Sequence, residues 1–494
     1  MVYLLTKIHT GDTMQKMRKF DTKIQHLKYK VLREVAREAW AGTLTEGVFD
    51  IPKRIIPGKV PTLRCCVYKE RAVATERVRM AMGGDKSNPN VIEVVDIACD
   101  ECPVGGHEVS NACRGCMMHR CEDVCKKGAI YFDNHHIAHI DKSKCVECGL
   151  CAKVCPYGAI INRKRPCQNA CKVKAISVSE DKTALIDNRK CTSCGACVYN
   201  CPFGAIVDKS YILDVINIIK DSQSNTKYKV YAVVAPSIAS QFTYATLGQV
   251  MSGLKQLGFY GIQEAALGAD IVAQEEAKEF ASKGFLISSC CPAFVDYVEK
   301  NFPAMREYVS NSISPMAAIA RRIKQADPNS KVIFVGPCTA KKAEAKKPTV
   351  SAYVDQVITF EELQALYDSK DIDISTLGET TLEGASGYGR TFARCGGLGE
   401  AIQEGLKEQG LDVTLKAISC NGIEECRLAL LKKSKNLIDV NFIEGMACVG
   451  GCIGGAGCLT HNDRNRERVE EYSRLAGDKT INDAVANVDN YIEE

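Results

Sequence analysis

The feature that most constrains this chain is a pattern of four cysteines that occurs twice. The spacing C-x2-C-x2-C-x3-C, with proline directly after the last cysteine, fills residues 145–156 and again residues 191–202. A 4Fe-4S cluster needs four thiolates, and in two-cluster domains with this spacing the fourth cysteine of each run ligates the other cluster. Zinc, the rival metal, favours two separated cysteine pairs. The pattern therefore predicts two 4Fe-4S clusters, one on Cys145, Cys148, Cys151 and Cys201 and the other on Cys191, Cys194, Cys197 and Cys155.

Two incomplete copies of the pattern indicate two further clusters. The endings CKKGAI at 125–130 and CKVKAI at 171–176 resemble the endings CPYGAI and CPFGAI of the complete runs. The copy ending at Cys171 lacks two cysteines, and Cys99 with Cys102 can supply that pair. The same crossover rule predicts a third cluster on Cys113, Cys116, Cys121 and Cys171, and a fourth on Cys99, Cys102, Cys167 and Cys125. Buried bystander cysteines are one alternative, and nearby histidine ligands are another: His107, His119, His135, His136 and His139.

Composition favours metal over disulfides. The 494 residues include 27 cysteines, and the start MVYLLTKIHTGD lacks the sustained apolar stretch of a secretory signal. A cytoplasmic location is therefore expected, where thiols stay reduced. The 64 basic and 60 acidic residues give a net charge of +4, which is too even to favour nucleic acid or an anionic membrane as a partner. The sequence contains no uninterrupted apolar run of about 18 residues, so no membrane span is predicted.

The pattern of residue types divides the chain into three segments. Residues 1–90 are interpreted as a helical segment, with helices expected over 14–42 and 66–82. Residues 91–210 hold the repeated cysteines and predict an α+β iron–sulfur domain of the bacterial ferredoxin-like type. Residues 211–494 alternate strands with helices and predict an α/β domain. The expected strands are 229–235, 284–288, 331–336, 411–419 and 437–443.

Three further cysteine motifs follow strand patterns in the α/β segment. They are SSCCP at 288–292, PCTAKKAE at 337–344 and EGMACVGGCIGG at 444–455. Loops at strand ends often carry function. Cysteines that are distant in sequence can converge there on one cluster.

Together these motifs resemble the three signatures of the FeFe-hydrogenases: TSCCP, PCxxKxxE and ExMxCxGGC. The resemblance covers the cluster segment and the catalytic region, and it implies the reaction 2H⁺ + 2e⁻ ⇌ H₂. In that family the motifs build the H-cluster, a 4Fe-4S cube joined through a cysteine to a diiron unit that carries CO, cyanide and an azadithiolate bridge. The resemblance implies that the cube is held by Cys291, Cys338, Cys448 and Cys452, with Cys452 as the bridge.

The resemblance also assigns residues around the diiron unit. Cys290 is implied as the thiol that exchanges a proton with the bridge amine. Lys341 is implied to hold one cyanide, the loop with Pro236 and Ser237 the other, and Met446 to pack beside the diiron unit.

A proton path is implied in the same way. Glu276, Glu279 and Ser310 match the family's relay to the thiol, and a buried metal that reduces protons needs titratable groups leading to the surface. For the two glutamates the alternative is an ordinary solvated helix face.

Several positions depart from the family pattern. Phe294 stands in place of the usual Trp, Gly336 in place of Met, and Ala340 in place of Ser. These changes resemble a less-studied branch of the family. The resemblance further implies an external electron carrier such as ferredoxin, and maturation proteins that make the diiron unit. Two alternatives stay open: a redox or H₂ sensor with the same cofactor, and a non-enzymatic hydrogenase-like iron–sulfur protein.

Overall fold

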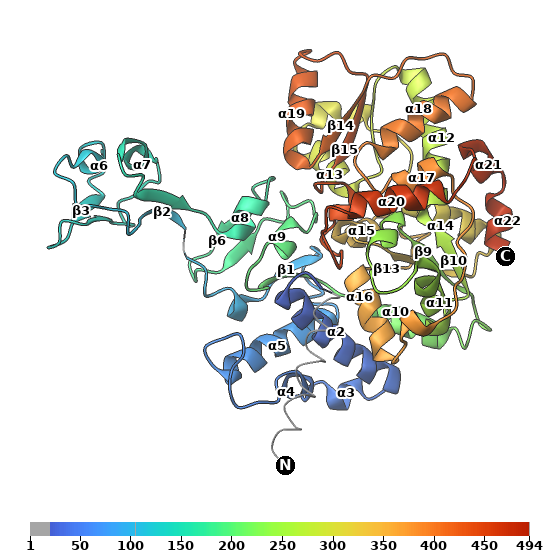
Figure 1. Cartoon of the computed structure of the whole chain (residues 1–494), viewed down its shortest axis with the longest axis horizontal. Helices are drawn as coiled ribbons and strands as arrows, with labels where there is room; N and C mark the ends of the chain where they lie inside the picture. Colours follow the sequence, from blue (N-terminus) through green and yellow to red (C-terminus); the bar gives the residue numbers. More distant parts are fainter. Residues whose placement is uncertain (1–19, 104, 494) are drawn as a thin grey trace.

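A computed structural model describes residues 20–103 and 105–493. Helices at the amino terminus are followed by a cysteine-rich region of short hairpins and then by a large α/β domain with parallel sheets (Figure 1). This order confirms the predicted fold class. Among the described residues, no helix is both long and apolar enough to cross a membrane.

The amino-terminal helices pack against both of the other regions. Helix α2 begins with a capping box between Thr22 and Gln25 and ends at Gly42 in the left-handed conformation. Its apolar face, which includes Val31, Leu32 and Val35, is buried. The helix expected over 66–82 is confirmed, and residues 14–19 of the other expected helix lie outside the described residues. The helices are α2 (Lys23–Ala41), α3 (Leu44–Gly47), α4 (Ile51–Ile55) and α5 (Val67–Ala81).

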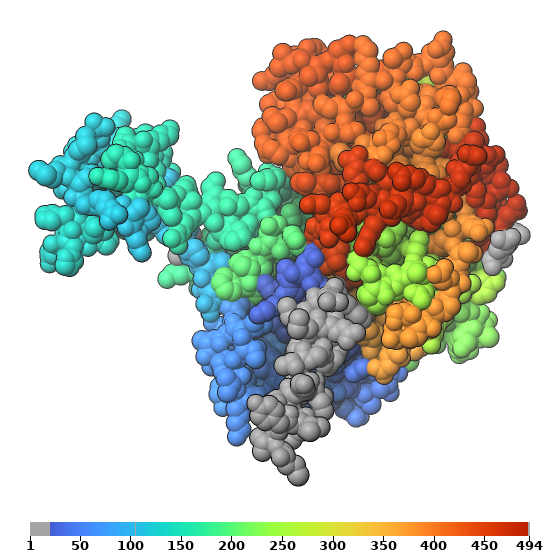
Figure 2. Space-filling view, viewed as in Figure 1, coloured from blue at the N-terminus to red at the C-terminus, as the bar shows by residue number. Residues whose placement is uncertain are grey.

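The cysteine-rich region consists of four antiparallel strand pairs and short helices. The pairs are β1 with β8, β2 with β5, β3 with β4, and β6 with β7. The pair of β2 and β5 leads to an arm that stands away from the body of the molecule (Figure 2). The elements are β1 (Ile92–Val94), η1 (Asp96–Ala98), β2 (Gly106–Val109), α6 (Arg120–Asp123), β3 (Ile130–Phe132), β4 (Ala138–Ile140), α7 (Leu150–Val154), β5 (Ile160–Arg163), α8 (Pro166–Ala170), β6 (Ile176–Val178), β7 (Ala184–Ile186), α9 (Ala196–Tyr199) and β8 (Ile206–Asp208).

Two parallel sheets form the α/β domain. One has the strand order β10-β9-β12-β13 and the other β11-β15-β14. The strands are β9 (Val230–Val234), β10 (Gly261–Glu264), β11 (Leu286–Ile287), β12 (Lys331–Val335), β13 (Gln356–Ile358), β14 (Ala417–Asn421) and β15 (Phe442–Met446).

All five expected strands have a counterpart, but two are displaced. Residues 411–416 form no strand, and β14 begins only at Ala417. Similarly, β15 begins at Phe442 rather than at residue 437. The second shift carries β15 into the third cysteine motif, which begins at Glu444. β10 and β13 were not expected, because runs of 4 and 3 residues leave little periodicity to recognise.

Helices surround the two sheets, and α12 lies at the centre of the domain against α14, α17, α18 and α21. The helices are α10 (Ile212–Asp221), η2 (Pro236–Ser240), α11 (Leu247–Leu257), α12 (Ala265–Lys283), α13 (Pro292–Asn301), η3 (Pro303–Tyr308), α14 (Pro315–Ala326), α15 (Thr339–Glu344), α16 (Phe360–Ser369), η4 (Ile374–Thr376), α17 (Gly387–Thr391), α18 (Gly397–Glu408), α19 (Ile423–Ser434), η5 (Cys452–Gly454), α20 (Asn465–Arg474), α21 (Ile481–Ala486) and α22 (Val488–Glu493).

Candidate metal centres

The four similar endings of the cysteine repeat share one local structure. In each, the amide of the residue four positions later donates to the sulfur of the last cysteine. The N···Sγ distances are 3.3 Å at Cys125 and Cys155 and 3.2 Å at Cys171 and Cys201. Such N–H···S bonds tune the potential of iron–sulfur clusters. The sequence repeat is therefore also a structural repeat.

Two groups of four cysteines lie on the arm. The first arm set is Cys113, Cys116, Cys121 and Cys155, which line one small cavity. In the second arm set, burial and the nearby Cys145 and Cys125 raise the pKa of Cys151. Cys148 belongs to the same loop, so this set is Cys125, Cys145, Cys148 and Cys151.

The other two groups lie where the arm joins the body. Burial and the neighbouring Cys201, Cys99 and Cys102 raise the pKa of Cys167 to about 11. These four cysteines form the base set. Burial, Cys191 and Cys171 likewise raise the pKa of Cys194 to about 11. Adding the nearby Cys197 gives the proximal set of Cys171, Cys191, Cys194 and Cys197.

The structure brings together all sixteen predicted accessory cysteines, but the predicted pairings are wrong. Cys125, not Cys201, accompanies Cys145, Cys148 and Cys151. Cys155 lies with Cys113, Cys116 and Cys121, and Cys171 lies with Cys191, Cys194 and Cys197. Cys201 lies with Cys99, Cys102 and Cys167.

Hairpins explain why these pairings were missed. The β3–β4 hairpin joins the motif ending at Cys125 to the motif beginning at Cys145. The β6–β7 hairpin does the same between Cys171 and Cys191. Crossover therefore occurs between consecutive motifs, each across its own hairpin. The sequence contained the signal, because both endings recur after 30 residues.

A fifth group lies at the carboxyl ends of parallel strands in the α/β domain. Cys291 follows β11 and precedes α13, Cys338 follows β12 and precedes α15, and Cys448 and Cys452 follow β15. Burial and the neighbouring Cys291 and Cys452 raise the pKa of Cys338 to about 12. Burial and the thiols of Cys338, Cys291 and Cys452 also raise the pKa of Cys448. The predicted catalytic set of Cys291, Cys338, Cys448 and Cys452 is thus brought together.

Polar groups predicted to hold cyanides lie near this set. Lys341 is 8% exposed, and its Nζ donates to Glu344 Oε2 at 2.8 Å and to the Cys290 carbonyl at 3.4 Å. Burial opposes its charge, but Glu344 raises the pKa of Lys341 above its usual value. Pro236 and Ser237 begin η2, which packs against η5 with Cys452. Met446 ends β15 and is 3% exposed.

The residues of the predicted proton path lie near one another, with two hydrogen bonds among their side chains and Ser289. Ser310 Oγ donates to Glu279 Oε2 at 2.8 Å, and Ser289 Oγ donates to Glu276 Oε1 at 3.0 Å. Burial raises the pKa of Glu276 to about 7, while hydrogen bonding from Ser289 and Ser310 opposes the rise. Burial also acts on Glu279, but Lys283 and Ser310 lower the pKa of this carboxyl overall. Burial, Cys291 and Glu276 raise the pKa of Cys290 far above that of a free thiol.

Two buried charged residues near the catalytic set were not predicted. Glu444 accepts from the amides of Gly396 at 2.7 Å and Gly399 at 3.1 Å, which fixes a loop beside the third motif. Lys342 is 1% exposed and lies 2.8 Å from carboxylates of both Asp208 and Glu362. This burial could not be recognised from the sequence, because Lys342 has the pattern of an exposed helix residue.

The proximal set lies directly against the catalytic set. Burial and the nearby thiols of Cys338, Cys291 and Cys194, the last from the proximal set, raise the pKa of Cys448. Thr339 Oγ1 donates to the Ser193 carbonyl at 2.7 Å. Gly195, with φ +77°, lies so close that a Cβ there would be 2.6 Å from Thr339 Oγ1. Glycine therefore permits this close approach of the two sets.

Two of the departures from the family pattern have packing explanations. The Phe294 ring covers Gly445 so closely that a Cβ at Gly445 would lie 2.1 Å from it. A Cβ at Gly336 would lie 2.5 Å from the Phe334 ring. Each glycine and its aromatic neighbour thus form one packing unit.

Known proteins are similar to both regions. Residues 228–456 match the family model described as iron only hydrogenase large subunit, C-terminal domain. Residues 112–159 and 165–205 match the model of the 4Fe-4S dicluster domain. The chain is 27% identical over 308 residues to iron hydrogenase 1 of Clostridium pasteurianum, covering 51% of this chain and 54% of that protein. It therefore spans about half the length of that relative.

Two other relatives have names that describe different roles. The chain is 28% identical to the periplasmic [Fe] hydrogenase large subunit of Nitratidesulfovibrio vulgaris, covering 66% of this chain and 87% of that protein. It is 32% identical to the cytosolic Fe-S cluster assembly factor NAR1 of Eremothecium gossypii, covering 28% of this chain and 33% of that protein. Residues 228–456 thus belong to the family of iron only hydrogenase large subunit, C-terminal domains, and residues 112–159 and 165–205 belong to the 4Fe-4S dicluster domains.

Proposed function

We propose that this protein is an FeFe-hydrogenase that catalyses reversible reduction of protons to H₂. One observation carries the proposal: the complete catalytic set lies beside Cys290, and Cys290 lies at the end of a line of carboxyl and hydroxyl groups that reaches the exposed Asn311. A protein that only holds a cluster has no need of such a line.

The residues present fit an H-cluster. Burial raises the pKa of all four thiols, and neighbouring thiols raise it further for Cys338, Cys448 and Cys452, so their joint deprotonation calls for a cationic partner such as iron. Ser237 Oγ is buried without a hydrogen-bond partner among the described residues, as expected of a group that holds a ligand. Lys341 uses two of the three protons on its ammonium group and keeps one donor.

Each protein group has a defined role in this proposal. Cys291, Cys338, Cys448 and Cys452 ligate the cube, and Lys341, Pro236, Ser237 and Met446 surround the diiron unit. When bound, the H-cluster supplies the iron at which protons and electrons combine. The raised pKa of Cys290 keeps its sulfur protonated, so the thiol can donate a proton into the site.

Protons reach Cys290 along the described side chains. Glu279, with a lowered pKa, collects them near the surface. Ser310 connects Glu279 to Glu276, whose pKa of about 7 lets it both accept and release a proton near neutrality.

Electrons pass through 4Fe-4S clusters on the four accessory sets. The arm sets lie farthest out, the base set stands where β2 and β5 leave the body, and the proximal set touches the catalytic set. We infer an external carrier such as ferredoxin, maturation proteins and a cytoplasmic location. We also propose a division into residues 1–90, 91–210 and 211–494.

A second candidate is a cluster-holding protein without turnover, which the similarity to the assembly factor favours. Infrared spectroscopy after maturation separates the two functions. Bands of CO and cyanide together with H₂ production support the hydrogenase. Their absence after a maturation that loads a known hydrogenase in parallel rejects it.

A substitution of Cys290 tests the catalytic step. Cys290→Ser should keep the infrared bands and lose at least about a hundredfold in H₂ turnover, since a positioned proton donor contributes about 10²–10⁴-fold. Cys420→Ser, at a buried thiol outside the ligand sets, is the matched control and should retain turnover.

A further inference from the structure

Three arginines converge on the base set, which is Cys99, Cys102, Cys167 and Cys201. Arg165 is fully buried, and its Nη1 lies 3.9 Å from the sulfur of Cys99. Arg77 is 6% exposed, and its Nη2 donates to the carbonyls of Phe203 at 3.0 Å and Gly204 at 3.2 Å, directly after Cys201.

The third arginine, Arg64, belongs to the amino-terminal segment. Arg64 Nη2 donates to the carbonyl of Ala98 at 3.0 Å, next to Cys99. Its guanidinium lies over the Phe203 ring, 5.0 Å from the ring centre. Cys102 lies within electrostatic range of both Arg165 and Arg64. Guanidinium groups from three separate segments thus surround the four sulfurs.

In the described part of the chain, two of these arginines lack the carboxylate partners that buried cations require, and the third has only partners that are partly exposed. Among the described residues, Arg77 and Arg165 have no carboxylate partner, and their hydrogen bonds go to carbonyls and to Cys99. Arg64 Nη1 is 3.5 Å from Glu101 and 3.8 Å from Asp100, whose side chains are 40% and 46% exposed. The Nη1 atoms of Arg64 and Arg77 are also buried without a hydrogen-bond partner.

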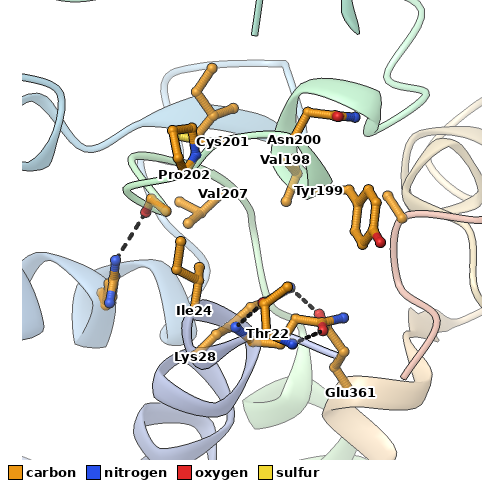
Figure 3. A pocket seen from close by; sticks show the side chains of 15 residues that line it. Thr22, Ile24, Lys28, Val198, Tyr199, Asn200, Cys201, Pro202, Val207 and Glu361 are labelled. Carbon is orange, nitrogen blue, oxygen red and sulfur yellow. Dashed lines mark hydrogen bonds and ion pairs between the residues drawn. The ribbon is translucent and has the colours of Figure 1, made fainter. Parts of the chain in front are cut away.

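Among the described residues, no unpaired carboxylate lines the cavity beside Cys201. It measures about 120 Å³ and is lined by Arg77, Cys201 and residues of helix α2 (Figure 3). Its carboxylate, Glu361, is bound to Lys28 at 2.5 Å. Because an isolated buried charge is costly, the missing negative charge has to come from the base set itself.

In the part of the chain that the structure describes, the other accessory sets have no comparable group of buried cations. Arg114 and Arg120 beside the first arm set are exposed to solvent, which screens their charges. His107 near the second arm set is paired with Glu147 at 2.7 Å. Lys300, which reaches the Cys191 carbonyl of the proximal set at 2.5 Å, is 33% exposed.

We propose that Arg64, Arg77 and Arg165 set the reduction potential of a 4Fe-4S cluster on the base set and make it the highest of the accessory clusters. Reduction adds one electron and therefore one negative charge, with no bond formed or broken and no proton required. Nearby buried cations stabilise the more negative state, so the reduced cluster gains most. The base cluster is then the first to be reduced and holds an electron between the arm and the proximal set.

This inference rests on the proposed cluster ligation but not on H₂ turnover, and it is tested without the diiron unit. The full chain is reconstituted with iron and sulfide, and its clusters are titrated by potential-controlled EPR. The signal with the highest midpoint should disappear in Cys102→Ser. Arg77→Met and Arg165→Met should lower that midpoint alone, changing its oxidised-to-reduced ratio at fixed potential about tenfold, which is 59 mV for one electron.

Two variants make the test specific. Arg77→Lys keeps the charge and should restore most of the midpoint, which a merely structural role would not predict. Arg189→Met, at a side chain 91% exposed, should change nothing. Survival of the highest-potential signal in Cys102→Ser, or an unchanged midpoint in Arg77→Met with full iron content, overturns the proposal.

Discussion

Lys342 Nζ lies 2.8 Å from Asp208 Oδ2, and neither side chain is more than 1% exposed. The contact joins the second catalytic motif to the last strand of the cysteine-rich region. It continues through Lys28, 2.6 Å from Asp208, to the amino-terminal helix α2. Lys28 and Lys342 hold the pKa of Asp208 far below its usual range despite burial. One buried chain of charges thus connects all three parts of the molecule.

Removing the central cation of this chain should destabilise the protein. Lys342→Met leaves Asp208 and Glu362 buried with fewer counter-charges, which costs about 3–5 kcal/mol. We expect a markedly lower thermal unfolding temperature in the reconstituted protein. Lys347→Met removes a lysine that is 40% exposed and paired with Asp296, and should cost no more than about 1 kcal/mol. Equal shifts in the two variants would show that the buried chain adds no stability.

Gly195 should be essential for the approach of the proximal set to the catalytic set. In Gly195→Ala the new Cβ would lie 2.5 Å from that of Ala456, and overpacking of this kind costs about 1–3 kcal/mol. Thermal unfolding should reveal this cost, and electron transfer into the catalytic cube, followed after flash reduction, should slow. Gly158→Ala is the matched control, since φ there is also positive but a Cβ meets nothing within 4 Å. If both variants behave alike, backbone strain alone explains the effect.

Glu276 should control both turnover and the pH dependence of stability. Its folded pKa of about 7 exceeds the ordinary value of 4.5, so the folded state holds a proton that the unfolded state releases. The stabilising contribution is full below about pH 4.5 and is lost as the pH rises through about 7, a change of roughly 3 kcal/mol. Glu276→Gln should reduce this loss, as measured by unfolding at pH 5 and pH 8.

The same variant should slow H₂ turnover at least about a hundredfold. Asp270→Asn is the control, because burial also raises the pKa of Asp270 to about 7 but its carboxylate binds Ser386 instead. Its stability should change with pH as in the other variant, while its turnover remains. Loss of turnover in both variants would count against a specific proton path.

Iron content can test the revised pairing of the accessory cysteines. Cys125→Ser and Cys145→Ser should each remove about four iron atoms per chain, and so should the double variant, since both cysteines serve one cluster. Cys145→Ser combined with Cys201→Ser should remove about eight. The originally predicted pairing gives the opposite result for the two double variants.

The sequence determined which residues form the catalytic set. The resemblance of the three motifs named them, and since β11 and β15 are parallel strands of one sheet, Cys291 and Cys448 lie at the same sheet edge. Cys338 follows β12 of the other sheet, so only the packing of the two sheets brings it beside them. The lengths and spacing of the short hairpins indicated less about which cysteines share a cluster. The recurrence of both endings after 30 residues indicated which motifs belong together, but the partners of Cys155 and Cys201 became clear only from the hairpins that join those motifs.

Only the tertiary structure revealed the buried cations. Lysine and arginine are almost never fully buried unless they are paired, so sequence alone assigns Lys342 and Arg165 to the surface. Their burial depends on partners distant in the chain: Asp208 and Glu362 for Lys342, and Cys99 with backbone carbonyls for Arg165. The sequence thus named the metal ligands by local spacing, whereas long-range packing decided which charges surround them, because the cost of burying a charge depends on all of its neighbours.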